Sequence, residues 1–277
     1  MGARDKRGRV LGAAFLLQAM TSLAGGIVLD FSLLAPGKIG EIMTRVAEHP
    51  AWMRADILDE MVTAGGVIWL GAILFATLRG YGETMARVGF ALYVLEGAVL
   101  AASRIGAFLL LTASTEYVRA GRAASLEPIG RVAYAAMDNG ALLHMVPFCA
   151  GAFLFYGLLY KSRAVPRWLA IWGLAAMVPV TVGTICTVLG IEIPFVLFVP
   201  YIPFEFFLGI WILIFGIRDE TGGAGSPPIE SRIIHLQGKQ VGLFPERHYQ
   251  SGSATHSAQS PAGLEAQLPE TLRAEVG

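Results

Sequence analysis

The chain has 277 residues, of which 55% are hydrophobic and only 15% are charged, well below the roughly 25% of charged residues in soluble domains. Its 21 basic and 21 acidic residues balance, so no overall field favours nucleic acid as a partner. This excess of apolar residues is too large for one soluble core, and it indicates that the lipid bilayer is the solvent of this protein.

Long apolar segments recur along the chain, each close to the roughly 20 residues that a helix needs to cross a hydrocarbon layer about 30 Å thick. They predict an all-α, polytopic transmembrane bundle of about six helices over residues 11–217, after a basic N-terminus over residues 1–10. The expected spans are Leu11–Leu34, Ile57–Leu78, Val88–Leu111, Asn139–Tyr160, Trp168–Leu189 and Phe195–Ile217.

The first span follows a basic cluster, and Ser22-Leu23-Ala24 resembles a signal-peptidase site. Apolarity nevertheless continues to Leu34, whereas the apolar region of a signal peptide has about 7 to 15 residues. We therefore expect this segment to be retained as a transmembrane helix.

Basic residues are divided unevenly between the two sides of the predicted bundle. The N-terminus and the Arg79–Arg87 and Lys161–Arg167 loops hold nine, whereas the three longer loops on the other side hold six. Cytoplasmic loops retain Lys and Arg. Both termini are therefore expected in the cytoplasm.

The first outer loop, Gly37–Asp56, is predicted to contain an amphipathic helix that rests on the membrane surface. Its apolar residues recur at helical spacing with charges between them: Ile39, Ile42, Met43 and Val46. A second outer loop, Thr115–Asp138, shows a weaker version of this pattern. In contrast, residues 218–277 include stretches rich in Gly, Ser and Pro, and we expect a mostly disordered cytoplasmic tail.

The third span carries two ionisable residues, Glu96 and Arg104, although such a group costs about 2.5 to 3.5 kcal/mol at the centre of a membrane helix. Eight residues separate them, which is about 12 Å along one helix, so each needs a partner on another helix. Small residues at short intervals allow close helix packing and predict a central position for this span: Gly97, Ala98, Ala101, Ala102 and Gly106.

Arg104 is expected near the outer end of its helix, where further polar residues converge: Asp30, Asp59, Glu60, Asp138 and His144. One interpretation is an outward-opening pocket for an anion or polar substrate. The other is an ion pair that only holds helices together. His144, one turn before Pro147, is open to the same choice between a titrating group and a packing residue.

The sixth span contains Pro200 and Pro203, which cannot lie inside a straight helix, so we predict a break and a regular helix that begins near Pro203. Broken helices in transporters place their half-helix ends at binding sites near the membrane midplane. Glu205 would lie in the first turn of the inner half-helix. There it is either a proton or cation site or a carboxylate that caps free amides.

Four segments occur in a characteristic order: Arg54 followed by Ile57-Leu58-Asp59-Glu60, the run with Glu96, Tyr156–Ser162 with Val165-Pro166-Arg167, and Phe204–Trp211. In these segments the chain resembles the bacterial membrane family called domain of unknown function 4386, over about residues 9 to 217. The resemblance implies six helices in a bacterial cytoplasmic membrane and no particular activity. The alanine-rich third span departs from the asparagine-containing segment of the family, so a role for Arg104 lies outside the resemblance.

No zinc-protease, serine-hydrolase or phosphate-loop motif is present in the sequence, and two cysteines make no metal signature. We expect no cofactor and no metal, and a small-solute or proton-coupled carrier, or an accessory of one, rather than an enzyme. The alternatives are an intramembrane enzyme for lipid or isoprenoid substrates, with the outer carboxylates and His144 as its reactive groups, and a non-catalytic scaffold or regulatory subunit. Expected partners are the bilayer and either a second copy of the chain or another membrane protein.

The predicted topology can be tested by cysteine labelling in intact cells. Cysteines introduced near Arg9, Tyr81 and Ser162 and in the tail should be protected from an impermeant reagent, because all four sites are expected in the cytoplasm. Labelling near Ser162 from outside would contradict this topology. A mature N-terminus at Gly25 would show that the first span is cleaved.

Overall fold

The computed structural model describes residues 3–25, 33–191 and 193–218, and within these ranges the regular structure is helical with no β-strand. The predicted all-α class is therefore confirmed, whereas Asp30 and the tail beyond residue 218 lie outside the described residues. The helices are α1 (Ala3–Leu23), α3 (Ile39–Glu48), α4 (Pro50–Leu78), α5 (Glu83–Arg119), α6 (Glu127–Leu143), α7 (Met145–Ser162), α8 (Arg167–Val188) and α9 (Tyr201–Phe215).

Four helical stretches are long and apolar enough to cross a membrane: Pro50–Tyr81, Glu83–Arg119, Ala124–Ser162 and Arg167–Val188. Two shorter apolar helices, Gly8–Leu23 and Tyr201–Phe215, accompany them. Large apolar side chains on the outer surface of these helices are exposed, for example Ile105 at 65%. So extensive an apolar surface suits lipid rather than water. The chain is a multi-pass transmembrane protein.

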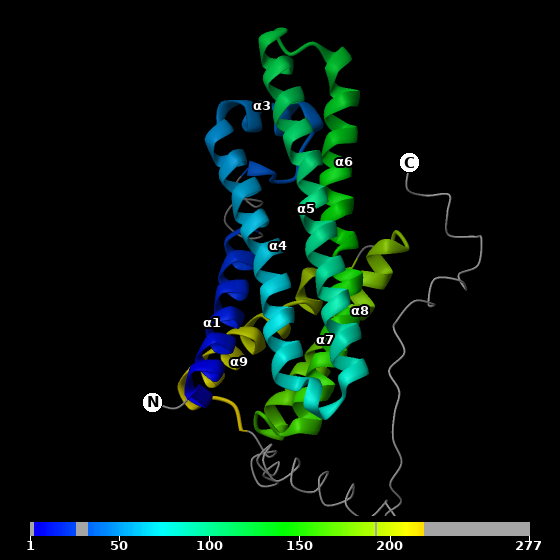
Figure 1. Cartoon of the computed structure of the whole chain (residues 1–277). Coiled ribbons are helices and arrows are strands. Elements are labelled where there is room, and N and C mark those ends of the chain that lie inside the picture. The colour runs from blue at the N-terminus through cyan, green and yellow to red at the C-terminus, as the bar shows by residue number, and fades with distance from the viewer. Residues whose placement is uncertain (1–2, 26–32, 192, 219–277) are drawn as a thin grey trace, which may run out of the picture. The chain divides into compact units, whose positions relative to one another are not determined.

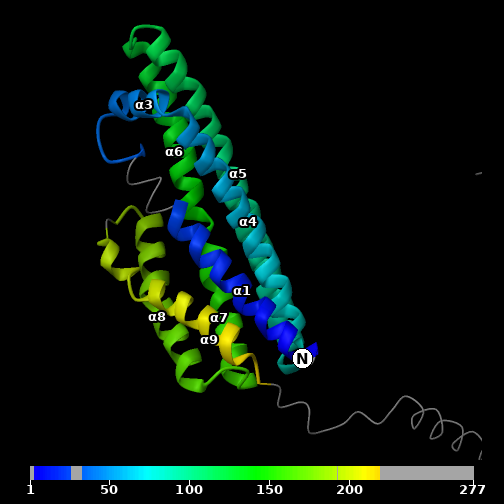
Figure 2. The ribbon, with the colours of Figure 1, turned by 90° about the vertical axis from the view of Figure 1, so that its left-hand side faces the viewer.

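Long helices set the architecture of the bundle. Figures 1 and 2 show α4, α5 and α6 as rods that run side by side, with α3 lying across them near one end. We call this end the α3 end, and we call the opposite end, where α1 begins, the N-terminal end. Helices α1, α7, α8 and α9 pack in the half of the bundle nearer the N-terminal end.

Helix α5 is the central element, as predicted from its small residues. It packs against α3, α4, α6 and α7. A Cβ atom on Gly97 would lie 2.7 Å from the backbone oxygen of Ala64 in α4, and one on Gly106 would lie 2.5 Å from the backbone nitrogen of Met137 in α6. Since real Cβ atoms do not approach other atoms so closely, these two glycines are required for the observed contact between helices.

The first predicted outer helix is present as α3, but its apolar face packs against protein. Met43 and Val46 are fully buried, and α3 contacts α5 and α6. The expectation of a helix resting on the membrane surface is wrong on this point, because α5 and α6 extend far enough to cover that face. The second outer loop, in contrast, does not form a separate surface helix. Helix α5 continues to Arg119 and α6 begins at Glu127, so this segment is the tip of a helical hairpin (Figure 1).

The predicted break in the last span is confirmed. A 3-10 turn, η4 (Phe195–Leu197), precedes α9, and the helix begins at Tyr201 with Pro200 as its N-cap residue. The helix thus starts two residues earlier than expected. Glu205 lies just beyond the first turn, which holds no acidic residue, so a role as an amide-capping carboxylate is not supported.

Two separate hydrophobic cores fill the bundle. The core nearer the N-terminal end, which we call the inner core, includes Leu70, Leu74, Phe155, Leu159 and Leu208. The core at the α3 end, which we call the outer core, is built from other side chains, including Met43, Met53, Ile57, Leu110 and Met137. The interior of the protein is therefore not continuously apolar from one end to the other.

The glycine contacts of α5 give a first test of this packing. Replacing Gly106 by Ala should lower the free energy of unfolding by about 1 to 3 kcal/mol, because the new methyl group would push α5 away from the α6 backbone. Gly65→Ala in α4 is the matched control, since nothing lies within 4 Å of its Cβ position. Thermal unfolding in detergent should show a lower midpoint for Gly106→Ala only. Equal midpoints for the two variants would contradict the close α5–α6 contact.

Candidate functional site: a polar layer between two cores

Buried polar side chains collect where the two cores fail to meet. On α4 the outer core ends at Ile57 and the inner core begins at Val67, whereas on α5 the inner core ends at Tyr93 and the outer core resumes at Ala107. The side chains in or bordering this gap form what we call the polar layer: Gln18, Asp56, Asp59, Thr63, Glu96, Ser103, Arg104 and His144.

Arg104 forms an ion pair across two helices in this layer. Its Nη1 donates to Asp56 Oδ2 at 3.4 Å, and its Nε donates to Ser103 Oγ at 3.1 Å. Both charged residues are buried, with Arg104 5% and Asp56 2% exposed. The contact is longer than an ordinary hydrogen bond, and Asp56 Oδ1 has no partner in the described part of the chain. The pair is therefore only partly satisfied by protein.

The carboxylates predicted to gather around Arg104 do so only in part. Asp59 interacts electrostatically with Asp56 and lies beside the end of α1, where a Cβ on Gly25 would be 3.1 Å from Asp59 Oδ2 and 2.8 Å from Glu60 Oε1. Asp138 is exposed on α6. The residue that bonds Arg104 is Asp56, which is not among the predicted partners.

His144 links α6 to α7 and is brought close enough to Arg104 for the two to interact electrostatically. Its Nδ1 is buried and has no partner among the described residues. In residues 3–25, 33–191 and 193–218, no three His, Cys, Asp or Glu side chains are grouped so that they could hold a metal ion. The geometry therefore gives no support to a metal-dependent enzyme built on His144 and the outer carboxylates.

Glu96 on α5 and Glu205 on α9 are within electrostatic range of each other, although α5 and α9 are not among the helices that pack extensively together. Glu96 is only 3% exposed, its Oε2 has no partner in the described residues, and it interacts electrostatically with Glu205. The Tyr201 hydroxyl interacts with the Glu205 carboxylate and lies 2.9 Å from the Tyr156 hydroxyl. Tyr93 also interacts with both glutamates. We call these five residues the glutamate–tyrosine cluster.

Aromatic contacts fix the tyrosines of this cluster. The ring of Tyr93 lies 5.1 Å from that of Phe155 in an edge-to-face arrangement, and the ring of Tyr156 lies 5.1 Å from that of Phe204 in a similar one. Contacts of this kind stabilise by about 0.5 to 1.5 kcal/mol beyond the buried area. The hydroxyl groups beside the two glutamates are thus held by packing rather than by their own polar bonds alone.

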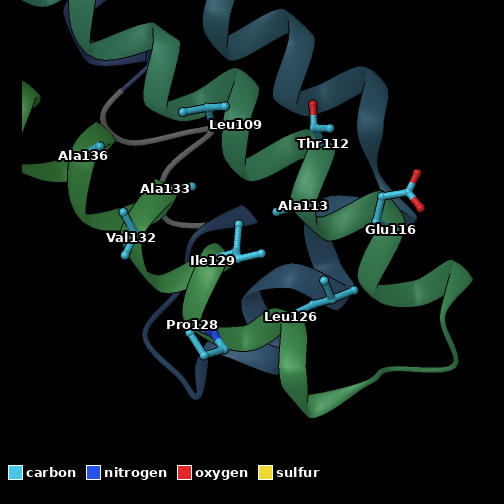
Figure 3. A pocket seen from close by; sticks show the side chains of 10 residues that line it. All are labelled: Leu109, Thr112, Ala113, Glu116, Leu126, Pro128, Ile129, Val132, Ala133 and Ala136. Carbon is cyan, nitrogen blue, oxygen red and sulfur yellow. The ribbon is translucent and has the colours of Figure 1, made fainter.

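Two hollows on the surface lie away from these glutamates. One, with a volume of about 560 Å³, is an apolar groove between α5 and α6 whose lining includes Leu109, Ile129 and Val132 (Figure 3). The other, also about 560 Å³, lies between α3 and the tip of the hairpin and is lined partly by charged residues such as Arg45 and Glu127. Neither is lined by Glu96, Arg104 or Glu205.

Comparison with known proteins gives one result for this architecture. A family model described as "Domain of unknown function (DUF4386)" matches residues 10–216, about three-quarters of the chain. The chain belongs to the DUF4386 family. The resemblance predicted from the sequence is confirmed, and no curated protein and no solved structure matches the chain.

One segment on which the DUF4386 resemblance rests forms the turn between α7 and α8. Ser162 Oγ accepts a hydrogen bond from the Ala164 amide at 3.3 Å, and Arg163 adopts a left-handed conformation with φ of 53°. The Ala164 carbonyl accepts the Arg218 amide at 2.9 Å, which ties the residues after α9 to this turn. In the structure this motif therefore fixes the α7–α8 turn and the segment that follows α9.

The Arg104–Asp56 pair gives the second test. Asp56→Leu should destabilise the protein by about 3 to 5 kcal/mol, because it leaves a buried guanidinium that cannot lose its charge. Arg104→Leu should cost less, since the remaining carboxyl group can take up a proton, and the double variant should recover much of the loss.

Thermal unfolding of both single variants and the double variant measures this coupling. The exposed pair Arg87–Glu83 is the control, because exposed pairs contribute only about 0 to 1 kcal/mol. Additive effects of Asp56→Leu and Arg104→Leu would show that the pair does not form.

Proposed function

We propose that this protein is a proton-coupled membrane carrier, or an accessory of one, whose proton site is the Glu96–Glu205 pair. One observation carries the proposal: Glu96 is only 3% exposed, its Oε2 has no partner among the described residues, and it lies within electrostatic range of Glu205 on α9. Buried ionisable groups are costly in a membrane protein and commonly mark proton or ion pathways.

The chemistry of such a pair suits proton binding. Carboxylates that interact strongly titrate together, so ionisation of one favours the protonated form of the other. The tyrosine hydroxyls beside them can donate or accept hydrogen bonds, and can therefore follow a change in charge at the glutamates. A binding event that alters the distance between Glu96 and Glu205 would change how strongly the pair holds its proton.

The broken last span supports the same proposal. Glu205 lies on α9 close to its proline-marked start, and α9 has only 15 residues, about 22 Å of helix. Discontinuous helices border the binding sites of many secondary transporters.

The other candidates have less support from the interior. A metal-dependent enzyme lacks a ligand group in the described residues. A scaffold or regulatory subunit needs no carboxylates in its interior, where ionisable groups lower the stability of a membrane protein. A scaffold therefore becomes the preferred function only if neither glutamate affects transport.

We place the protein in a bacterial cytoplasmic membrane, with both termini in the cytoplasm. Family membership and the apolar helices support an integral membrane protein, and the excess of basic residues in the shorter loops supports this orientation. The α3 end would then face outward.

The proposal is tested with the full chain in liposomes. An acidic outside and a mixture of small polar metabolites should lead to uptake of at least one solute, measured by mass spectrometry of the liposome contents. Glu96→Gln and Glu205→Gln should each reduce this uptake to the level of protein-free liposomes, because neither amide can carry the proton. Glu116→Gln, an exposed residue on the same helix as Glu96, should leave uptake unchanged.

Two results would contradict the proposal. One is gradient-driven uptake that survives both interior substitutions. The other is the absence of gradient-driven uptake of any solute by the unmodified protein, which would exclude a carrier that works alone and leave an accessory or a scaffold.

A further inference from the structure

Unpartnered polar atoms concentrate in the polar layer. In native proteins the large majority of buried side-chain polar atoms have a hydrogen-bond partner. Among the described residues, however, all but one of the buried side-chain atoms that lack a partner belong to this layer, the exception being Ser114 Oγ. The layer atoms are Gln18 Oε1, Asp56 Oδ1, Asp59 Oδ2, Thr63 Oγ1, Glu96 Oε2 and His144 Nδ1.

Three of these atoms lie along one face of α4. Asp56, Asp59 and Thr63 fall within about 60° of one another around the helix axis and span about 10 Å along it. Asp59 is only partly buried, beside the end of α1, whereas Thr63 is 4% exposed. The face therefore leads from a partly accessible carboxylate to a deeply buried hydroxyl.

The same face reaches the level of the proposed proton site. Gly97 of α5 lies against Ala64 of α4, so the neighbouring residues Glu96 and Thr63 are at nearly the same depth. On the α1 side, Gln18 Oε1 lies 3.0 Å from the Cβ position of Gly66. Unpartnered oxygens from three helices thus gather around this level.

Beyond this level α4 becomes apolar. Val67, Leu70 and Leu74 belong to the inner core and are almost fully buried. Leu70 lies about two turns below Thr63 on the same face, and Tyr93 and Phe155 fill the neighbouring space. The line of polar atoms therefore ends at Glu96 and does not continue to the N-terminal end.

We propose that this face of α4 lines a narrow water path that carries protons from the side of the membrane bearing the α3 end to Glu96. The inference rests on the proposed function, for which it supplies the entry route. The unpartnered atoms can accept hydrogen bonds, and water supplies the donors while making 2 to 4 bonds of its own.

The charges around the path fit a proton rather than an anion. Asp56 and Asp59 lie on this face of α4, and Glu96 lies at nearly the same depth on α5. Arg104 is the opposing charge on α5, and its guanidinium is already bonded to Asp56 and Ser103. Carboxylates thus outnumber the guanidinium along the route, and Asp59, at the partly exposed end, is the entry residue.

The path predicts a pattern of thiol accessibility. In a chain with Cys149 and Cys186 replaced by Ala, Thr63→Cys should react with Ag⁺, a small thiol-reactive cation. Leu70→Cys, on the same helix face within the inner core, should not react. Reaction is measured as the loss of later maleimide labelling of the denatured protein. Right-side-out and inverted vesicles are treated separately, and only the orientation that exposes the α3 end to Ag⁺ should show the loss.

Gln18→Cys is a second probe of the same level, so the test does not depend on one variant, and size-exclusion profiles verify that each variant folds. If Thr63→Cys and Gln18→Cys react with Ag⁺ as little as Leu70→Cys does, the path is refuted. If Thr63→Cys and Leu70→Cys react equally with Ag⁺, the claim that the inner core closes the path is refuted. Thiol accessibility is measured without solute uptake, so the two proposals can fail separately. If Thr63→Cys reacts but Glu96→Gln leaves uptake unchanged, the path stands and the proposed function is refuted.

Discussion

The structure depends on one constraint: a polar group inside a hydrocarbon layer finds no water from the lipid, so the protein must supply its partners or a hydrated space. Helix α5 carries Glu96 and Arg104 through the interior. Because α3, α4, α6 and α7 pack around it, both charged side chains are removed from lipid. Arg104 is bonded directly by Asp56, whereas Glu96 keeps an oxygen that no described protein group satisfies.

Helix packing and polar chemistry are linked through the small residues of α5. Gly97 allows α4 to approach α5 closely at the level of Glu96. Gly106 allows α6 to approach α5 closely below the hairpin tip. The outer core fills the bundle around α3, so the path enters beside it, at the partly exposed Asp59, and the inner core closes the path below Glu96. A polar layer between two dry cores is an arrangement that can admit protons from one side without opening a continuous channel.

The sequence alone predicts most of the fold, because span length and apolarity are local properties and Pro200 and Pro203 act on their own backbone. It misses Asp56, since apolarity places the start of the second span at Ile57, whereas α4 begins at Pro50 and turns Asp56 inward. Glu96 and Glu205 are each identifiable in the sequence as charges within predicted spans. Their proximity is a tertiary property, and neither hydropathy nor spacing reports which helices become neighbours.

The most direct test of the account is an experimental structure of the full chain in lipid, at a resolution that shows ordered water. We expect water within hydrogen-bond distance of Thr63 Oγ1 and Glu96 Oε2, and none around Leu70 and Leu74. If Thr63 and Glu96 are instead satisfied by protein groups with no water between them, the polar layer is a structural network. The proton path would then be excluded.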